Sequence, residues 1–471
     1  MRYITVSSAI SIANVNVLRI TRSLTSSAKF STMDIPVSRG LPIIGNLLAL
    51  LRAGGASNLH HYIDKRHKKH GVIFKEKLGA NVHAVFISDP DMMRAVFAKE
   101  GKHPVHVLPE AWTLYNELYG CARGLFFMNG TEWLHHRRVM NNFLLKSGPE
   151  DFMKEAIEAS AGSLNLLQWE HNLEEALYRW SLDTIIAVML GKKLYLECKS
   201  DINEKLDTAS HKIKLIFETS AQLQFMPIRL AHRLGLRIWR DFVQAVDDAL
   251  INTSGLVYEL MRISQNTGLN STYDMGVISL MRSSQIAPSD IIKIVVDLVL
   301  AAGDTTAYTM QWVLYSLAKH PEYQNCIEAS DIKNLMRETL RLYPVAPFLT
   351  RINTDHDIVA GNYYIPRNTL IIYSLYTVGR DEKYFYQPNK FNPERWRSKT
   401  PQMMQASLPF AMGARSCIGR RIAEIQLMST LQKVLKSYSI RLQQPNEDID
   451  MILKLISVPS KPIRLIFKEK Y

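Results

Sequence analysis

One cysteine lies in a setting that strongly constrains this chain: Cys417, within the segment FAMGARSCIGRRIAE at residues 410–424. Gly413 and Gly419 flank it, and glycines let the backbone approach a flat ligand and adopt unusual φ values. A helix-like run begins near Ile418. A thiolate just before a helix is stabilised by the N-terminal dipole and by backbone N–H donors. The segment therefore predicts an accessible, anionic sulfur rather than a small core residue.

The same segment carries cations. Arg415 stands two residues before Cys417, and its planar guanidinium is suited to a carboxylate. Iron in a porphyrin can use these groups, namely an axial anionic sulfur, hydrogen-bond donors that stabilise the sulfur and arginines that bind the two propionates. The segment thus indicates a haem-binding loop. With four cysteines in the chain and no CxxC, neither a disulfide framework nor a zinc site is indicated.

The chain has 471 residues and is 47% hydrophobic, which excludes a disordered or fibrous protein. Helical periodicity dominates from residue 149 to about 345. Strand-like alternation occurs near both ends of the chain, at residues 72–78, 82–87, 363–372 and 452–467. No linker separates these blocks. We predict one mainly α domain with a smaller β-rich part over residues 34–471.

Charge is unevenly distributed. The net charge is +13, and residues 1–33 contain arginine, lysine and serine but no acid. This composition is typical of an organelle transit peptide, so we expect the leader to be removed on import, a disordered tail being the alternative. No N-terminal run of about 18 apolar residues occurs, so membrane contact is expected to be peripheral. Residues 60–71, rich in His and Lys, are interpreted as a solvated basic helix face.

Further patterns accompany the cysteine segment. Glu338 and Arg341 share a helix face, which alone is typical of a surface pair. The same holds for Trp133 and Arg137, four positions apart. The run AAGDTT at residues 301–306 follows an apolar stretch, and its glycine and threonines weaken the helical hydrogen-bond ladder. That weakening predicts a local groove, with a simple kink as the alternative.

Together these residues resemble the cytochrome P-450 family. The haem signature of that family matches at Phe410, Gly413, Arg415, Cys417 and Gly419. The resemblance covers nearly the whole chain after the leader. It implies a cytochrome P-450 fold with haem b (iron protoporphyrin IX), and Cys417 as the axial ligand of the iron.

The resemblance also implies roles for the other motifs. Glu338, Arg341 and Arg395 are expected to form a buried structural network. Asp304 and Thr305 are expected to relay protons to bound oxygen, in a groove made tighter by Ala302, where the family usually has glycine. Contacts to the haem propionates are expected from Trp133, Arg137, Arg351 and Arg415. Only 34 positions separate Asp304 from Glu338, so the connection between them is shorter than usual.

A thiolate-bound haem activates O2 and inserts one oxygen atom into a C–H bond, so the resemblance implies a monooxygenase. No flavin or dinucleotide fingerprint is present, so NADPH-derived electrons must arrive from outside. A basic set on the cysteine side resembles the mitochondrial class, which docks an adrenodoxin-type ferredoxin: Lys333, Arg337, Arg420 and Arg421. Solvated cations without function are the alternative.

Five apolar segments are predicted to line a pocket for a large lipophilic ligand, an ordinary core being an equal alternative: residues 107–115, 217–227, 296–302, 345–349 and 455–458. The wording AAGDTTA resembles the insect ecdysteroid hydroxylase branch, in particular its 2-hydroxylases. We therefore expect a steroid hydroxylase acting on an ecdysteroid precursor at the matrix side of the mitochondrial inner membrane, without nucleic acid. An oxygen-independent haem-thiolate isomerase or dehydratase and a non-catalytic haem sensor stay open.

Overall fold

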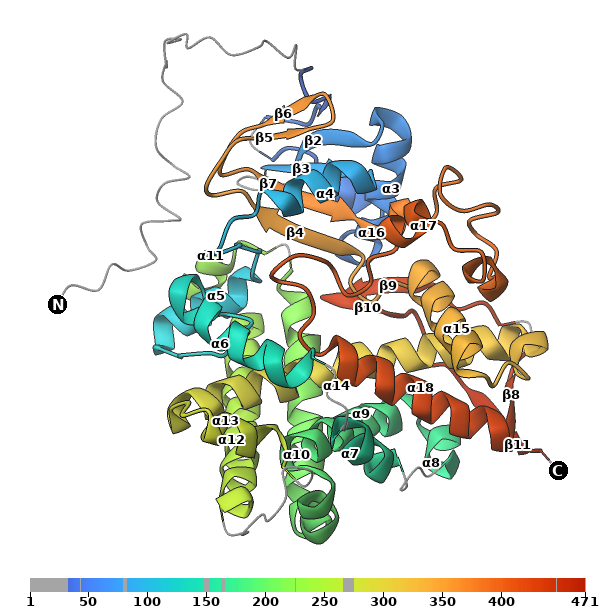
Figure 1. Cartoon of the computed structure of the whole chain (residues 1–471). Helices are drawn as coiled ribbons and strands as arrows, with labels where there is room; N and C mark the ends of the chain where they lie inside the picture. Colours follow the sequence, from blue (N-terminus) through green and yellow to red (C-terminus); the bar gives the residue numbers. More distant parts are fainter. Residues whose placement is uncertain are drawn as a thin grey trace.

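The computed structural model of the chain describes residues 33–470 apart from 43, 79–82, 147–151, 162–165, 225, 266–274 and 446. Helices make up most of it (Figure 1). They are α2 Leu47–Arg52, α3 Leu59–His70, α4 Pro90–Ala98, α5 Glu110–Tyr119, α6 Gly130–Leu144, α7 Phe152–Ala161, α8 Leu166–His171, α9 Leu173–Leu190, α10 Lys192–Gln222, α11 Ile228–Arg233, α12 Arg237–Gln265, α13 Val277–Ser283, α14 Pro288–Lys319, α15 Ala329–Leu342, α16 Leu375–Val378, α17 Pro401–Ala406 and α18 Arg420–Ser437.

A sheet in the order β1-β2-β3-β7-β4 lies at one end of the molecule, at the top of Figure 1. Its strands are β1 Val37–Ser38, β2 Ile73–Lys77, β3 His83–Ile87, β7 Leu370–Ser374 and β4 Phe348–Ile352. Three two-stranded sheets complete the β part: β5 Ile358–Ala360 with β6 Tyr363–Ile365, β8 Tyr438–Leu442 with β11 Leu465–Glu469, and β9 Met451–Lys454 with β10 Ile456–Pro459. In the large sheet β3 runs parallel to β7, and β4 runs antiparallel to it.

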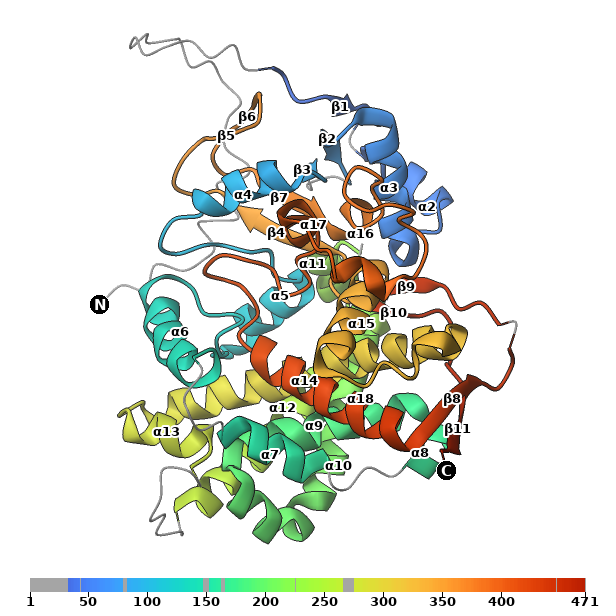
Figure 2. The same cartoon turned by 45° about the vertical axis from the view of Figure 1, so that its right-hand side comes forward.

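Helix α14 forms the centre of the helical part, where it contacts α9, α10, α12, α15 and α18. It starts with Pro288 at its first position, where the missing N–H costs nothing, and nearly all of its side chains are buried. A helix that is apolar on every side must be enclosed by other elements. In both views α18 lies beside α15 and crosses α14 (Figures 1 and 2), so the segment that precedes α18 is carried to the middle of the molecule.

The predicted fold class is confirmed, since helices dominate and a smaller β part joins the two ends of the chain. The strand-like run at residues 363–372 is divided between β6 and β7. The interpretation of residues 60–71 was wrong in one respect. They form α3, but His60 and His67 are buried, because that face of the helix packs on the sheet and α16.

The expected leader, residues 1–33, lies outside the described residues except for Met33. None of the helices in the described part of the chain is long and apolar enough to cross a membrane.

Candidate active site

The loop before α18 holds Cys417 in place through its backbone. The Cys417 amide donates to the carbonyl of Phe410 at 2.9 Å, and the Ser416 amide donates to that of Gly413 at 3.1 Å. Gly413 has φ +79°, and a Cβ there would collide with the Glu100 carboxylate. The turn therefore requires glycine for both its conformation and its close packing. Helix α18 begins three residues after Cys417, somewhat later than the sequence predicts.

Cys417 is exposed, yet the protein mass around it raises the pKa of its thiol by desolvation. The Gly419 backbone N–H, Arg137 and Arg420 act in the opposite direction and favour the thiolate. A side chain that is accessible and at the same time surrounded by protein must open on an internal surface. Cys417 thus presents sulfur to the interior, at the N-terminal end of α18.

An accessible strip also occurs on α14. Ala301 and Thr305 are exposed in a helix that is otherwise almost fully buried, and four positions place them on one face. The Thr305 hydroxyl donates to the Ala301 carbonyl at 3.1 Å, and Thr309 donates to the Thr305 carbonyl at 2.7 Å. Helix α14 stays continuous through residues 301–306. The helix is therefore not broken here. The threonine hydroxyls instead bond to backbone carbonyls of the helical hydrogen-bond ladder.

Asp304 points away from this strip. Its carboxyl is buried against α9 and accepts a hydrogen bond from the Tyr178 hydroxyl at 3.4 Å. Burial raises the pKa of Asp304 well above its usual value, which favours the protonated form. Gly303 also faces Tyr178, whose ring leaves no room for a Cβ. The glycine is thus required by the packing of α9 on α14.

Four predicted cofactor contacts lie around the Cys417 loop. The Arg415 guanidinium stacks on the Trp133 ring at 3.9 Å and donates to the carbonyls of Pro104, Leu125 and Met128. Arg137 donates to the Ser416 carbonyl at 2.6 Å. Burial, together with the nearby charges of Arg137 and Arg351, lowers the pKa of Arg415 to about 10.

Arg351, on β4, pairs with a carboxylate that no sequence motif indicated. Its Nε donates to Glu100 at 2.7 Å, and the two side chains are 6% and 8% exposed. The other Glu100 oxygen accepts the Ala414 amide at 2.7 Å, while Arg351 also donates to the Met412 carbonyl at 3.3 Å. Glu100 therefore connects β4 to the Cys417 loop.

These residues fit a haem. Arg137 and Arg351 each lie close enough to Arg415 to repel it, and Glu100 is the acid that opposes them there. Three cations against one carboxylate leave two positive charges, which matches a group with two propionates. His106 lies beside Arg415 and Arg351, and among the described residues its buried ring nitrogens have only the Phe126 backbone as a weak hydrogen-bond partner. The sulfur of Cys417 would supply the donor for iron.

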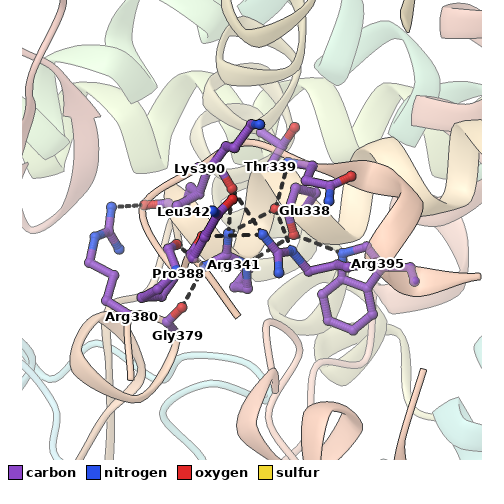
Figure 3. A network of polar contacts seen from close by, with 12 residues as sticks. Glu338, Thr339, Arg341, Leu342, Gly379, Arg380, Pro388, Lys390 and Arg395 are labelled. Carbon is purple, nitrogen blue, oxygen red and sulfur yellow. Dashed lines mark hydrogen bonds and ion pairs between the residues drawn. The ribbon is translucent and has the colours of Figure 1, made fainter. Parts of the chain in front are cut away.

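The predicted structural residues meet in a second, fully buried cluster (Figure 3). Glu338 accepts hydrogen bonds from Arg341 at 2.8 and 2.9 Å and from Arg395 at 2.9 Å. The Trp396 indole and the Asn392 amide each add a contact at 2.9 Å. Arg341 donates to carbonyls of Gly379, Pro388 and Lys390. The network fastens the segment before the Cys417 loop to α15.

The predicted docking cations are distributed over α15 and the start of α18. Lys333 and Arg420 are exposed and Arg337 is half-buried, close enough to Arg420 and Glu424 to sense both charges. Arg421 instead donates to the Lys146 carbonyl. Lys333 and Arg337 line a surface groove of about 580 Å³ together with Arg397 and Lys399. Between α14 and α15 stands only the short 3-10 helix Pro321–Tyr323, in agreement with the short connection.

The predicted pocket segments come together in pairs. Trp112 donates to the Ser220 hydroxyl at 2.9 Å, which joins residues 107–115 to residues 217–227 within their described part. The Ser457 amide donates to the Val345 carbonyl at 2.9 Å, which joins β10 to the start of β4. Helix α14, which carries residues 296–302, contacts β10.

Comparison with known proteins gives consistent matches. The family model described as cytochrome P-450 matches residues 35–329 and 332–467. Cytochrome P-450 315a1, mitochondrial, from Drosophila melanogaster is 39% identical over 93% of this chain and 89% of its own length. The mitochondrial cholesterol side-chain cleavage enzyme of Oncorhynchus mykiss is 31% identical over 90% and 88%. The mitochondrial 1,25-dihydroxyvitamin D(3) 24-hydroxylase of Mus musculus is 29% identical over 92% and 88%.

Proposed function

Because the chain belongs to the cytochrome P-450 family, we propose that it is a mitochondrial monooxygenase that hydroxylates a steroid, specifically an ecdysteroid precursor. The observation that carries this proposal is the placement of Cys417, whose sulfur opens on the interior at the start of α18. The steroid assignment is supported by relatives that are named for cholesterol and dihydroxyvitamin D(3). The mitochondrial assignment is supported by the names of the same relatives and by the transit-like composition of residues 1–33.

Haem bound through a thiolate supplies the activation of O2 and the transfer of one oxygen atom to a C–H bond. The chain contributes the thiolate, which the Gly419 N–H and the charges of Arg137 and Arg420 stabilise against the desolvation of Cys417. Arg137, Arg351 and Arg415 would hold the propionates, with Trp133 stacked beneath Arg415. Buried cations of this kind bind carboxylates with fixed geometry.

Proton delivery is assigned to Thr305 and Asp304. Thr305 lies on the accessible strip of α14, and its hydroxyl can turn from the Ala301 carbonyl toward the interior. Burial raises the pKa of Asp304 well above its usual value, which favours the protonated carboxyl. Because this carboxyl contacts Tyr178 on α9, it must rotate before its proton reaches the Thr305 face.

Electrons are proposed to arrive from an adrenodoxin-type ferredoxin at the face formed by α15 and the start of α18. Lys333 and Arg420 present exposed cations there, and the groove beside Lys333 and Arg337 also carries Arg397 and Lys399. Charges at the edge of an interface mainly raise the association rate, and salt screens them. Reduction of the haem by ferredoxin should therefore slow as ionic strength rises, and more weakly so in Lys333→Gln than in the wild type.

The test is reconstitution with NADPH, ferredoxin reductase and ferredoxin against a panel of sterols, with the products identified by mass spectrometry. Hydroxylation of an ecdysteroid precursor is expected, together with the red-shifted Soret band of a ferrous carbon monoxide complex. A histidine-type spectrum would refute Cys417 as the ligand. Turnover of hydroperoxides without ferredoxin would favour an isomerase, and turnover with a microsomal flavoprotein alone would overturn the mitochondrial class.

A further inference from the structure

A second group of ligating side chains lies outside the Cys417 site, between α6 and the start of α14. Glu132 and His136 are one turn apart on α6, and Asp290 is in the first turn of α14. Each offers one ligand atom, and these atoms all lie within 4.8 Å of one another. Positions four apart on a helix project from the same face, so Glu132 and His136 can act on one centre.

His136 is the unusual member of the group. It is 6% exposed, and its Nδ1 has no hydrogen-bond partner within the described part of the chain. Its Nε2 lies 3.5 Å from Oδ2 of Asp290, too far for a good hydrogen bond. The nitrogen that faces Asp290 thus lacks a close hydrogen bond to it, and a cation between the two groups would bind both.

The two carboxylate oxygens of Asp290 have different neighbours. Oδ1 accepts Lys293 at 2.9 Å, while Oδ2 faces the imidazole. Lys293 therefore pairs with one oxygen of Asp290 and leaves the other available to a cation. Glu132 is exposed, so its side chain can move inward without disturbing the core.

We propose that Glu132, His136 and Asp290 form a binding site for a divalent transition cation, with Zn²⁺ as its preferred ion, that joins α6 to the start of α14. One imidazole and two carboxylates with an open fourth position suit Zn²⁺. Mg²⁺ and Ca²⁺ prefer oxygen ligands alone. Tetrahedral ligands at Zn²⁺ bond lengths stand about 3.4 Å apart, so a rotation of Glu132 closes the site.

The site has a structural consequence. His136 is followed directly by Arg137, which contacts the Cys417 loop through the Ser416 carbonyl. A cation on His136 would fix this part of α6 against the helix that carries Thr305. The inference does not depend on the proposed function, because binding and stability can be measured without substrate.

The experiment is calorimetric titration of the haem-containing protein with ZnCl2, after a chelator has removed exchangeable metal ions, followed by thermal unfolding. Saturable binding of one Zn²⁺ per chain is expected, with a Tm rise of about 3 °C at a hundredfold excess over the Kd. MgCl2 at the same concentration should give neither effect. His136→Gln and Glu132→Gln should weaken binding at least tenfold, whereas Lys293→Met should strengthen it by removing a competing cation.

His135→Gln is the matched control, because His135 is the exposed neighbour on the same helix. If it weakens Zn²⁺ binding as much as His136→Gln does, the ion sits elsewhere and the proposal fails. Unchanged affinity in Glu132→Gln, which alters an exposed side chain and leaves the core intact, would also overturn it. So would the absence of stoichiometric binding to the wild type.

Discussion

Glu338 and Arg341 face each other across one turn of α15 with both side chains completely buried, and Arg341 donates to both carboxylate oxygens. Each oxygen is also shared, one with Arg395 and the other with Trp396. A buried ion pair adds little over a hydrophobic pair, but it costs several kcal/mol when one member is removed. The pair therefore contributes little net attraction to the stability of the fold. Its importance is the large free-energy cost of losing one of its two members.

Glu338→Gln should destabilise the protein by about 3–5 kcal/mol, because it leaves two buried guanidinium groups without their counter-charge. Urea unfolding followed by circular dichroism measures the loss. Asp91→Asn is the control, because Asp91 and Arg94 form an exposed pair of the same spacing. That substitution should cost no more than about 0.5 kcal/mol. Equal losses in the two variants would show that burial of the pair does not matter.

Thr305→Ala should divert electrons from product to peroxide, because it removes the hydroxyl on the accessible strip of α14. Thr309→Ala is the matched control, since Thr309 makes the same kind of contact to a carbonyl but is buried. Peroxide formed per NADPH consumed should rise severalfold in the first variant alone. Unchanged coupling in Thr305→Ala would remove this hydroxyl from proton delivery.

Asp304→Asn should leave stability nearly unchanged but slow turnover about tenfold or more, because the carboxyl already favours its neutral form and only its proton is lost. The measurements are kcat with its solvent isotope effect, and Tm. Asp297→Asn provides the contrast, since Asp297 forms a buried ion pair with Arg123 at 3.0 Å. That variant should instead lose stability by about 3 kcal/mol. A normal kcat in Asp304→Asn would contradict the assigned role.

Much of this arrangement could be predicted from residue spacing. The spacing of three positions from Glu338 to Arg341 put them on one helix face, and the run AAGDTT after an apolar stretch was placed within a helix. The direction in which each side chain of a helix points was harder to predict. Asp304 and Thr305 are adjacent, yet Asp304 is buried against Tyr178 and Thr305 lies on the accessible strip of α14, because neighbouring helical positions differ by about 100°.

Contacts that depend on distant parts of the chain could not be predicted at all. Glu100 lies in no motif, and its partner Ala414 is 314 positions away. The burial of His67 also depends on tertiary packing, since its ring contacts Ser374, 307 positions away, and its sequence neighbours are cations. Composition alone therefore favoured a solvated face for α3.

His67 predicts a loss of stability in acid. Burial lowers its pKa from 6.5 to about 4. Between these two pH values the unfolded chain therefore binds a proton at His67 and the folded protein does not. The stability that the neutral ring maintains above pH 6.5 is thus lost as the pH falls toward 4. Between pH 7 and 5 the cost is about 2 kcal/mol. Urea unfolding of His67→Gln should show a pH dependence smaller by that amount, and His135→Gln, at an exposed position, should behave as the wild type.

His106 gives a test of the cofactor fit that does not depend on turnover. Its ring nitrogens are buried with only a weak contact to the Phe126 backbone in the described structure, and it lies beside Arg351 and Arg415. If the ring donates to a propionate, His106→Phe removes a hydrogen bond to a charged group, which corresponds to roughly tenfold faster haem loss. Transfer of haem to apomyoglobin measures the rate. His106→Gln keeps a donor, so its rate of haem loss should lie between those of the wild type and His106→Phe. Equal rates in His106→Phe and the wild type would mean that the propionates lie beyond the reach of this ring.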